Sequence, residues 1–445
     1  MAHVLRRPCS PNVLGGNEEY YFRQPTHYMS FPRSLTTKQA FLLSCCLVVL
    51  YVLLIMAASG KLPDFLSAYR SLFQWDGHFY ASIVHEGYFV RKMDWPIIGN
   101  PTQDRTNVAF FPAYPFFSIF VSLIFFLPTD IALILTSQIA CVLLITYTIL
   151  LLQKFGLSAA GALFGAVALI CFPGAFFLIA SLPESLLLAG AAGYLYWSLH
   201  ERPSFLLSAG HGIVLTATKI LGAPVVLLPV INALVRRERK DVIRQTLSAG
   251  FALLGLTGFL LFCQWVFGHW NLYFAVQKAG WNVEPAYVFF LHPEILKTIL
   301  FPWTIHWPTY TDFTGTVITN TLNRESYYAV SCIAWWVLLW PCLEWITGSL
   351  LRIVTWRRRA AYYVGTALLW YVIVVSTWNS GMQSAFRYSL LPFFLMLLTV
   401  AHRSATLPSR NIRFSLTGIL CVLLLSGIIL QYGLAVSFTH GGWVG

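Results

Sequence analysis

The sequence predicts an all-α polytopic membrane protein with about nine to eleven transmembrane helices. Hydrophobic residues make up 57% of the 445 residues and charged residues only 10%, with a mean hydropathy of +0.67. Soluble domains carry about 25% charged residues, so this chain lacks the polar surface that water requires. The 16 Trp and 21 Tyr agree with this class, because their rings favour membrane–water interfaces.

The formal charge of +12 comes from basic residues that gather beside apolar runs. Four blocks hold more than half of the 29 Lys and Arg: 1–40, 236–244, 352–359 and 402–413. Such a distribution is typical of the cytoplasmic ends of transmembrane helices. We therefore expect these blocks to be cytoplasmic and expect no nucleic-acid partner.

The polar segment 1–40 precedes the first apolar run and is expected to be a cytoplasmic N-terminal segment rather than a cleavable signal peptide. Residues 41–445 are expected to form a single polytopic domain with outer loops 60–112 and 268–327. The nine Cys show no CxxC or Cys/His spacing, and most lie inside apolar runs. They are predicted to be buried free thiols, and no metal site is predicted.

Runs of roughly 20 apolar residues are the candidate spans. In chain order they are 41–59, 131–152, 159–179, 185–199, 246–267, 328–350, 361–377, 386–401 and 414–437.

Two further apolar segments allow two arrangements. In the first, 113–127 is a full span and 204–234 is one helix. In the second, 113–127 is a re-entrant or surface helix, and 204–234 breaks into two short helices near Lys219, where Gly222 and Pro224 interrupt the run. Both arrangements keep the basic blocks on one side. We favour the second, because it gathers the ionisable residues on the outer side.

The first outer loop contains a carboxylate between aromatic residues, in the run Gln74-Trp75-Asp76-Gly77-His78-Phe79-Tyr80. A partly dry carboxylate at the mouth of a membrane cavity is a candidate general base. The alternative is that Asp76 only caps a surface helix.

Late in the chain, Arg387 begins an apolar helix after Trp378-Asn379-Ser380-Gly381-Met382-Gln383. An arginine on the outer side runs against the charge trend, and its guanidinium suits a phosphate. The alternative is an arginine that reaches the outer lipid headgroups.

Two more ionisable residues lie in apolar surroundings. Lys219 interrupts 204–234, and an ionisable group at that depth usually marks a functional site. Glu184 follows Pro183 at the start of a helix, where the helix dipole alone would stabilise it. The remaining polar residues of the outer loops are expected to be solvated: Asp94, Asp104, Asn107, His269, Asn282 and Asp312.

Together these motifs resemble the PIG-V family, named for GPI mannosyltransferase 2, and its prokaryotic relatives. The resemblance covers roughly residues 70–400 and rests on an ordered set: Trp75-Asp76, Glu86-Gly87-Tyr88, Phe110-Phe111-Pro112 with Tyr114-Pro115, Phe172-Pro173, Pro183-Glu184-Ser185 and Arg387-Tyr388. Lys219 stands where the family pattern leads us to expect an arginine. The runs Phe267-Gly268-His269-Trp270 and Gly442-Trp443-Val444 are closer to prokaryotic members.

The resemblance implies a C-type glycosyltransferase architecture whose active site faces away from the cytoplasm. It implies an inverting transfer of mannose from polyprenyl (dolichyl) phosphate to a lipid-linked acceptor. That acceptor is the GPI glycolipid, at its second mannose in α1,6 linkage, if the chain is eukaryotic, and another lipid or glycan if it is prokaryotic. The membrane is accordingly that of the endoplasmic reticulum or the prokaryotic plasma membrane. A small membrane subunit is compatible with this class, and no cofactor or divalent metal is indicated.

By the same resemblance Asp76 is the catalytic residue, and Arg387 with Lys219 binds the donor phosphate. The expected substrate-binding residues are Trp75, His78, Glu184, Gln383 and Tyr388. Two other classes stay open on the residues alone, namely a lipid or sugar transporter (flippase) and a non-catalytic membrane scaffold. A transporter favours charges near the bilayer midplane in paired halves, whereas Asp76, Glu184 and Arg387 lie at predicted helix ends.

Overall fold

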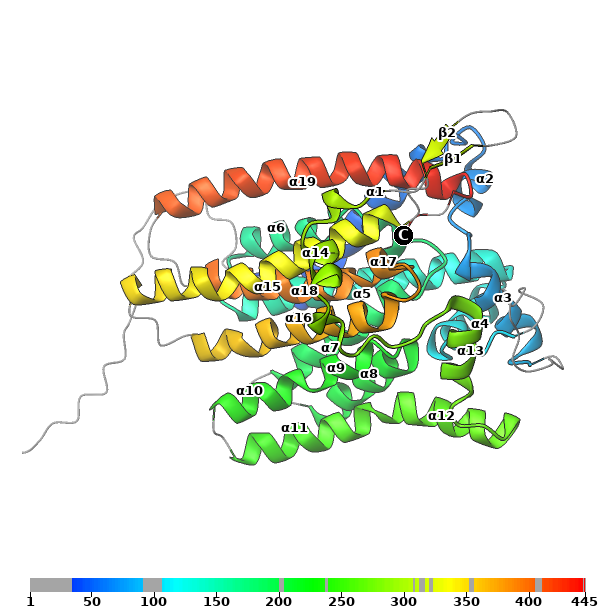
Figure 1. The fold of residues 1–445 in the computed structure, drawn as a ribbon, viewed down its shortest axis with the longest axis horizontal. Helices are drawn as coiled ribbons and strands as arrows, with labels where there is room; N and C mark the ends of the chain where they lie inside the picture. The colour runs from blue at the N-terminus through cyan, green and yellow to red at the C-terminus, as the bar shows by residue number, and fades with distance from the viewer. Residues whose placement is uncertain are drawn as a thin grey trace, which may run out of the picture.

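The computed structural model describes residues 34–90, 106–199, 204–236, 239–306, 309–311, 317–319, 323–351, 356–404, 410–442 and 444. Its long helices run roughly side by side (Figure 1). Five helical segments in the described residues are long and apolar enough to cross a bilayer. They are α1 (Thr37–Ala58), α5 (Thr129–Lys154), α11–α12 (Arg239–Ala252 and Leu254–Phe267), α15 (Arg324–Leu351) and α17–α18 (Ala385–Tyr388 and Leu390–Ser404). The predicted class, a helical multi-pass membrane protein, is confirmed.

The rest of the helical body consists of α4 (Ala113–Phe125), α6 (Ala159–Ile170), α7 (Glu184–Ser198), α8 (Phe205–Thr218), α9 (Gly222–Val226), α10 (Leu228–Arg236), α16 (Trp356–Thr377) and α19 (Arg410–Thr439). Most predicted spans agree with these bounds to within a few residues. The prediction for 159–179 was too long, since α6 ends at Ile170 and only a short 3-10 helix, η1 (Ala175–Leu178), follows. Pro173 lies between them, and proline cannot continue the hydrogen-bond ladder of a helix.

The segment 204–234 breaks at Lys219, as the second arrangement predicts. Lys219 is extended, with φ −159° and ψ 149°, and directly follows α8. The serine hydroxyls of Ser198, Ser208 and Ser248 form a hydrogen-bonded row across α7, α8 and α11. Thr216, two turns further along α8, bonds the carbonyl of Ala252, so α8 runs parallel to α11 and antiparallel to α7. After Lys219 the chain turns back onto α8, where Gly222 lies against the backbone of Leu215.

Helix α4 also fits the second arrangement. Its 13 residues span about 20 Å, short of a bilayer core. The Tyr114 hydroxyl bonds the carbonyl of Leu133 and the hydroxyl of Ser137, which anchors the start of α4 against α5. Large apolar side chains such as Phe120 and Leu123 are exposed on the far side of α4. The length of α4 therefore favours the second arrangement, in which 113–127 is a re-entrant or surface helix.

The described parts of the two loops that we expect on the outer side, 60–112 and 268–327, fold into short elements. The first holds α2 (Phe65–Arg70) and α3 (Asp76–Glu86). The second holds α13 (Leu272–Trp281), η2 (Phe289–Leu291), α14 (Pro293–Leu300), η3 (Pro302–Thr304) and an antiparallel hairpin of β1 (Thr309–Thr311) and β2 (Val317–Thr319). This hairpin is a small exception to the all-α expectation. In Figure 1, α2, α3 and α13 lie at the right, whereas α10 and α11 meet at the left, near the basic block 236–244.

A continuous cluster of buried apolar side chains runs from α1 to α19. Of the seven cysteines whose burial the structure describes, Cys141, Cys171 and Cys263 lie buried in the interior. The expectation that the cysteines are buried was wrong for Cys46, Cys332 and Cys342, which are exposed. An apolar run in a membrane protein has faces toward lipid as well as toward the interior, so hydropathy alone does not separate the two.

Gln431 is a polar residue that ties α19 to this core. Its side chain, 1% exposed, donates to the Tyr51 hydroxyl and to the carbonyls of Ile170 and Phe172. We predict that Gln431→Leu destabilises the protein by about 1–3 kcal/mol, because these acceptors would lose a donor in a dry interior. The thermal unfolding midpoint in detergent measures this. Leu430→Ala, at a residue that is 60% exposed, is the control and is expected to unfold near the wild-type temperature. Equal midpoints for wild type and Gln431→Leu would contradict the prediction.

Candidate functional site

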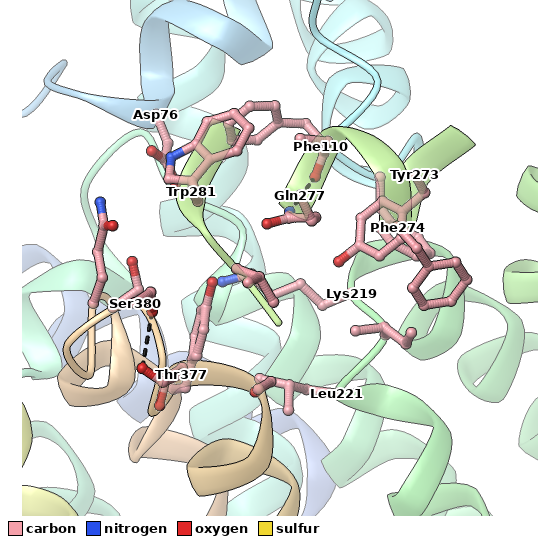
Figure 2. A pocket seen from close by; sticks show the side chains of 18 of the residues that line it. Asp76, Phe110, Lys219, Leu221, Tyr273, Phe274, Gln277, Trp281, Thr377 and Ser380 are labelled. Carbon is pink, nitrogen blue, oxygen red and sulfur yellow. Dashed lines mark hydrogen bonds between the residues drawn. The ribbon is translucent and has the colours of Figure 1, made fainter. Parts of the chain in front are cut away.

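A cavity of about 790 Å³ lies where the loops 60–112 and 268–327 meet the ends of the core helices. Its walls come from α3, the loop before α4, the break between α8 and α9, α13, the C-terminal end of α16, and α17. Figure 2 places Asp76 at the upper left, Gln277 and Lys219 near the centre, Ser380 at the left and Thr377 at the lower left. These six segments of the chain therefore line one cavity.

The dominant interaction in the cavity is an ion pair between Asp76 and Arg387. Oδ2 of Asp76 lies 2.6 Å from Nη2 of Arg387, and these side chains are only 13% and 8% exposed. The same Nη2 donates to the Ser384 hydroxyl at 3.0 Å. Two charges so far from water must compensate one another, because an isolated buried charge costs several kcal/mol.

A second ion pair lies directly behind the first. Nζ of Lys219 lies 2.5 Å from Oε1 of Glu184, whose side chain is 1% exposed. Nε of Arg387 lies 3.8 Å from the same oxygen. Nζ of Lys219 also lies 4.4 Å from the ring centre of Tyr388, which adds a cation–π attraction. The four charges therefore alternate in sign, as Asp76, Arg387, Glu184 and Lys219.

Rare backbone conformations precede both partners of the first ion pair. Trp75, just before Asp76, has φ 50° and ψ −114°. Met382 and Ser384, shortly before Arg387, have φ of 61° and 64°. Positive φ is costly for residues with a side chain and persists where surrounding structure enforces it, often at functional sites. At Trp75 one such contact is the indole N–H, which donates to the carbonyl of Gly442 at 3.1 Å.

Asp76 enters the cavity because Gly77 lets α3 start close to the turn before α7. A Cβ at Gly77 would collide with the hydroxyl of Ser181. Ser181 is itself held in place, since its N–H and hydroxyl both donate to the carbonyl of Leu72. The Asp76-Gly77 pair therefore combines the charged group with the only residue type that allows this approach.

Six of the eight residues predicted from the sequence line the cavity: Trp75, Asp76, Lys219, Gln383, Arg387 and Tyr388. Glu184 does not, because it is buried behind Lys219 and Arg387. His78 does not either. It is exposed, and its ring packs on the edge of Phe73 at 4.6 Å between ring centres. On a helix, His78 lies two positions from Asp76 and so faces another direction.

Several residues of the cavity wall were not predicted from the sequence. Tyr80, Phe110, Gln277 and Trp281 all line it. Tyr80 could have been predicted from the sequence, because it lies one helical turn after Asp76 on α3 and therefore faces the same side. Burial, and next the nearby carboxylate of Asp76, raise the pKa of the Tyr80 phenol well above its usual value, so it stays a neutral hydrogen-bond donor.

Two residues expected to be solvated have structural roles. Asn107 is fully buried, and its amide nitrogen donates to the Ser82 hydroxyl and the carbonyl of Gly87. Asn282 donates to the carbonyl of Asn379, which joins the end of α13 to the loop after α16. These side-chain amides donate hydrogen bonds to loop carbonyls that have no partner in a helix or strand. Asp94, Asp104 and Asp312 lie outside the described residues.

Among the residues that the structure describes, no group of three or more His, Cys, Asp or Glu side chains is placed to hold a metal ion. Both carboxylates of the charged cluster are paired with cationic side chains. The hydrogen-bond donors of this cluster, the ammonium of Lys219 and the guanidinium of Arg387, suit an anionic ligand.

No protein-family model matches the sequence, and no curated protein matches it. Among solved structures, the chain is similar to ArnT from Cupriavidus metallidurans bound to undecaprenyl phosphate, with a TM-score of 0.45 and 15% identity over 88% of this chain and 76% of that one. It is also similar to the apo oligosaccharyltransferase of Archaeoglobus fulgidus, with a TM-score of 0.44 and 14% identity over 89% of this chain and 56% of that one. The chain thus spans little more than half of the archaeal protein. These similarities are distant and carry no conclusion about function.

The alternation of charges predicts how mutations affect stability. Glu184→Leu leaves the buried cations of Lys219 and Arg387 undercompensated and should cost about 3 kcal/mol or more. The double variant Glu184→Leu/Lys219→Met removes both charges and should recover part of the loss. The unfolding midpoint in detergent measures both effects.

The control is Lys278→Met, which breaks an exposed ion pair with Glu284, where the side chains are 62% and 53% exposed. It should change the midpoint little, because water screens that pair. A double variant no more stable than Glu184→Leu would show that the charges do not compensate one another.

Proposed function

We propose that this chain is a membrane glycosyltransferase of C-type architecture, which transfers mannose from polyprenyl (dolichyl) phosphate to a lipid-linked acceptor. The observation that carries the proposal is the close pair of Asp76 and Arg387 in a shared cavity, 2.6 Å apart, with Lys219 beside them. The PIG-V-like motifs supply the identity of the sugar and the donor.

Transfer of a sugar from a phosphate needs a base and a cationic site on opposite sides of the reacting carbon. The acceptor oxygen forms a bond to the anomeric carbon, while the bond from that carbon to the phosphate oxygen breaks. The Asp76 carboxylate takes the acceptor's proton, and the lipid phosphate leaves with the electron pair. Arg387 and Lys219 stabilise the charge that develops on the phosphate. Attack from the face opposite the phosphate turns a β-linked donor into an α-linked product.

The lining of the cavity also suits a lipid donor. Beside Lys219, its wall includes the apolar side chains of Ile220, Leu221, Val372 and Phe274. A prenyl chain along this wall would remain in apolar surroundings while its phosphate reached the cations. A soluble sugar nucleotide would gain nothing from this surface.

The ion pair implies an order of binding. Without substrate, Arg387 holds a carboxylate oxygen of Asp76. A donor phosphate competes for the same guanidinium, and its arrival would free that oxygen for the acceptor's hydroxyl. We therefore expect the donor to bind before the acceptor.

The basic helix ends support an active site on the non-cytoplasmic side. Arg239, Lys240 and Arg244 lie at the start of α11, at the left of Figure 1, whereas α3 and α13, which line the cavity, lie at the right. By the charge rule the left end is cytoplasmic. The membrane is then that of the endoplasmic reticulum with a GPI glycolipid acceptor, or a prokaryotic plasma membrane with another lipid or glycan.

The first test replaces the proposed base. Asp76→Asn should lower transfer of radiolabelled mannose from polyprenyl phosphate at least about a thousandfold, because the amide cannot take a proton. Donor binding should persist, since Arg387 loses a competitor. The control Asp64→Asn changes an exposed carboxylate of the same loop, which caps α2, and should retain activity. Turnover near the wild-type rate by a folded Asp76→Asn protein would refute the assignment.

The second test concerns Lys219. Lys219→Arg keeps the charge and should stay within a few fold of wild type, whereas Lys219→Gln should raise the donor KM about tenfold through loss of phosphate contact. Initial rates at varied donor concentration measure both. Lys61→Gln, at an exposed lysine of the outer loop, is the control. An unchanged donor KM in Lys219→Gln would remove Lys219 from the phosphate site.

A further inference from the structure

The cavity has a second wall, made of aromatic rings, next to Asp76. Phe79 comes from α3, Phe110 from the loop before α4, and Trp281 from the end of α13. The ring centres of Phe79 and Phe110 are 4.5 Å apart, and each lies 5.8 Å from that of Trp281. Figure 2 shows Asp76, Trp281 and Phe110 at one end, with Lys219 and Leu221 farther along the cavity.

This aromatic wall is fixed from behind. Phe110 is 7% exposed and packs against the edge of Tyr80 at 5.1 Å. The Tyr88 hydroxyl donates to the carbonyl of Phe110 at 2.7 Å, and the Gln277 amide donates to that of Ala109 at 3.2 Å. A ligand that binds to rings already held in place loses little entropy in ordering them.

We propose that the half-buried rings of Phe79 and Trp281, backed by the buried ring of Phe110, form the binding site for the acceptor sugar, a pyranose that packs its C–H face on these rings. The faces of aromatic rings are electron-rich and attract the polarised C–H groups of a sugar. Phe79 lies one helical turn after Asp76, so both face the same side of α3. A sugar on this wall therefore turns its hydroxyls toward the carboxylate. That this sugar is the acceptor rests on the proposed function.

The donor's prenyl chain fits the aromatic wall less well. Gln277 and Lys278 line the same cavity about one helical turn before Trp281, and Asp76 lies one turn before Phe79. A hydrocarbon chain packed here would desolvate these polar groups without giving them hydrogen bonds. Sugar hydroxyls can bond to them. The apolar surface around Leu221 serves the chain better.

The test is binding of octyl α-D-mannopyranoside, below its micellar concentration, to the full chain in lipid nanodiscs. Trp281→Ala should weaken this affinity at least about fivefold, the effect of one lost stacking contact. Phe79→Leu is a second variant with the same expectation, in case the first fails to fold. Trp270→Ala removes an exposed tryptophan just before α13 that does not line the cavity, and should leave the mannoside affinity unchanged. Binding of 1-octanol should be insensitive to Trp281→Ala, which separates the sugar from its alkyl chain.

Two results would overturn the proposal. One is equal mannoside affinity in wild type and in both variants of the wall. The other is a loss confined to the polyprenyl-phosphate donor, which would make the wall part of the donor site. A wall-dependent mannoside affinity in a protein that transfers no mannose would contradict the glycosyltransferase proposal and leave the sugar site intact, so the two failures are distinguishable.

Discussion

The ion pair between Asp76 and Arg387 is the constraint on which the rest of the site depends. It joins a short helix of the first outer loop to a helix near the end of the chain, at 2.6 Å and almost out of water. Each charge is tolerable there only because the other is present. Glu184 and Lys219 extend the arrangement to four alternating charges, so that two cations can face an anionic ligand without an excess of uncompensated charge in the empty site.

The helical body serves this cluster by bringing helix ends together. Three of its four members lie at helix termini: Asp76 and Glu184 begin α3 and α7, and Lys219 follows α8. The helix dipole stabilises a carboxylate at the start of a helix. Helix α8 ends at Thr218, so the side chain of Lys219 can reach the cavity. Positive φ at Trp75 and Ser384 is the local cost of aiming Asp76 and Arg387 at one another. The fold thus places these helix ends and this backbone strain around the cavity.

Much of the helical body could be predicted from hydropathy, because lipid leaves a backbone few alternatives to a helix. The break at Lys219 was foreseeable from Gly222 and Pro224, and Asp76, Lys219 and Arg387 stood out as ionisable groups beside apolar runs. The features that could not be predicted depend on the direction of side chains on a helix and on contacts between residues far apart in the sequence. His78 was predicted to bind substrate because it is near Asp76 in the sequence, but the start of α3 at Asp76 turns it to another side of the helix. Glu184 was taken for a ligand contact, since a buried counter-ion and a substrate-binding acid look alike in sequence. Trp281 could not be found, because nothing near it in the sequence points to Phe79.

The cavity combines a cationic end, an apolar surface and an aromatic wall around one carboxylate, which matches a donor phosphate, its lipid chain and an acceptor sugar. The most direct measurement is a cryo-electron microscopy structure of the wild-type chain in nanodiscs with a bound polyprenyl phosphate. The account predicts the phosphate within hydrogen-bonding distance of Arg387 and Lys219, with Asp76 released from its present contact and directed into the open cavity. A phosphate bound elsewhere, with the pair of Asp76 and Arg387 undisturbed, would contradict it.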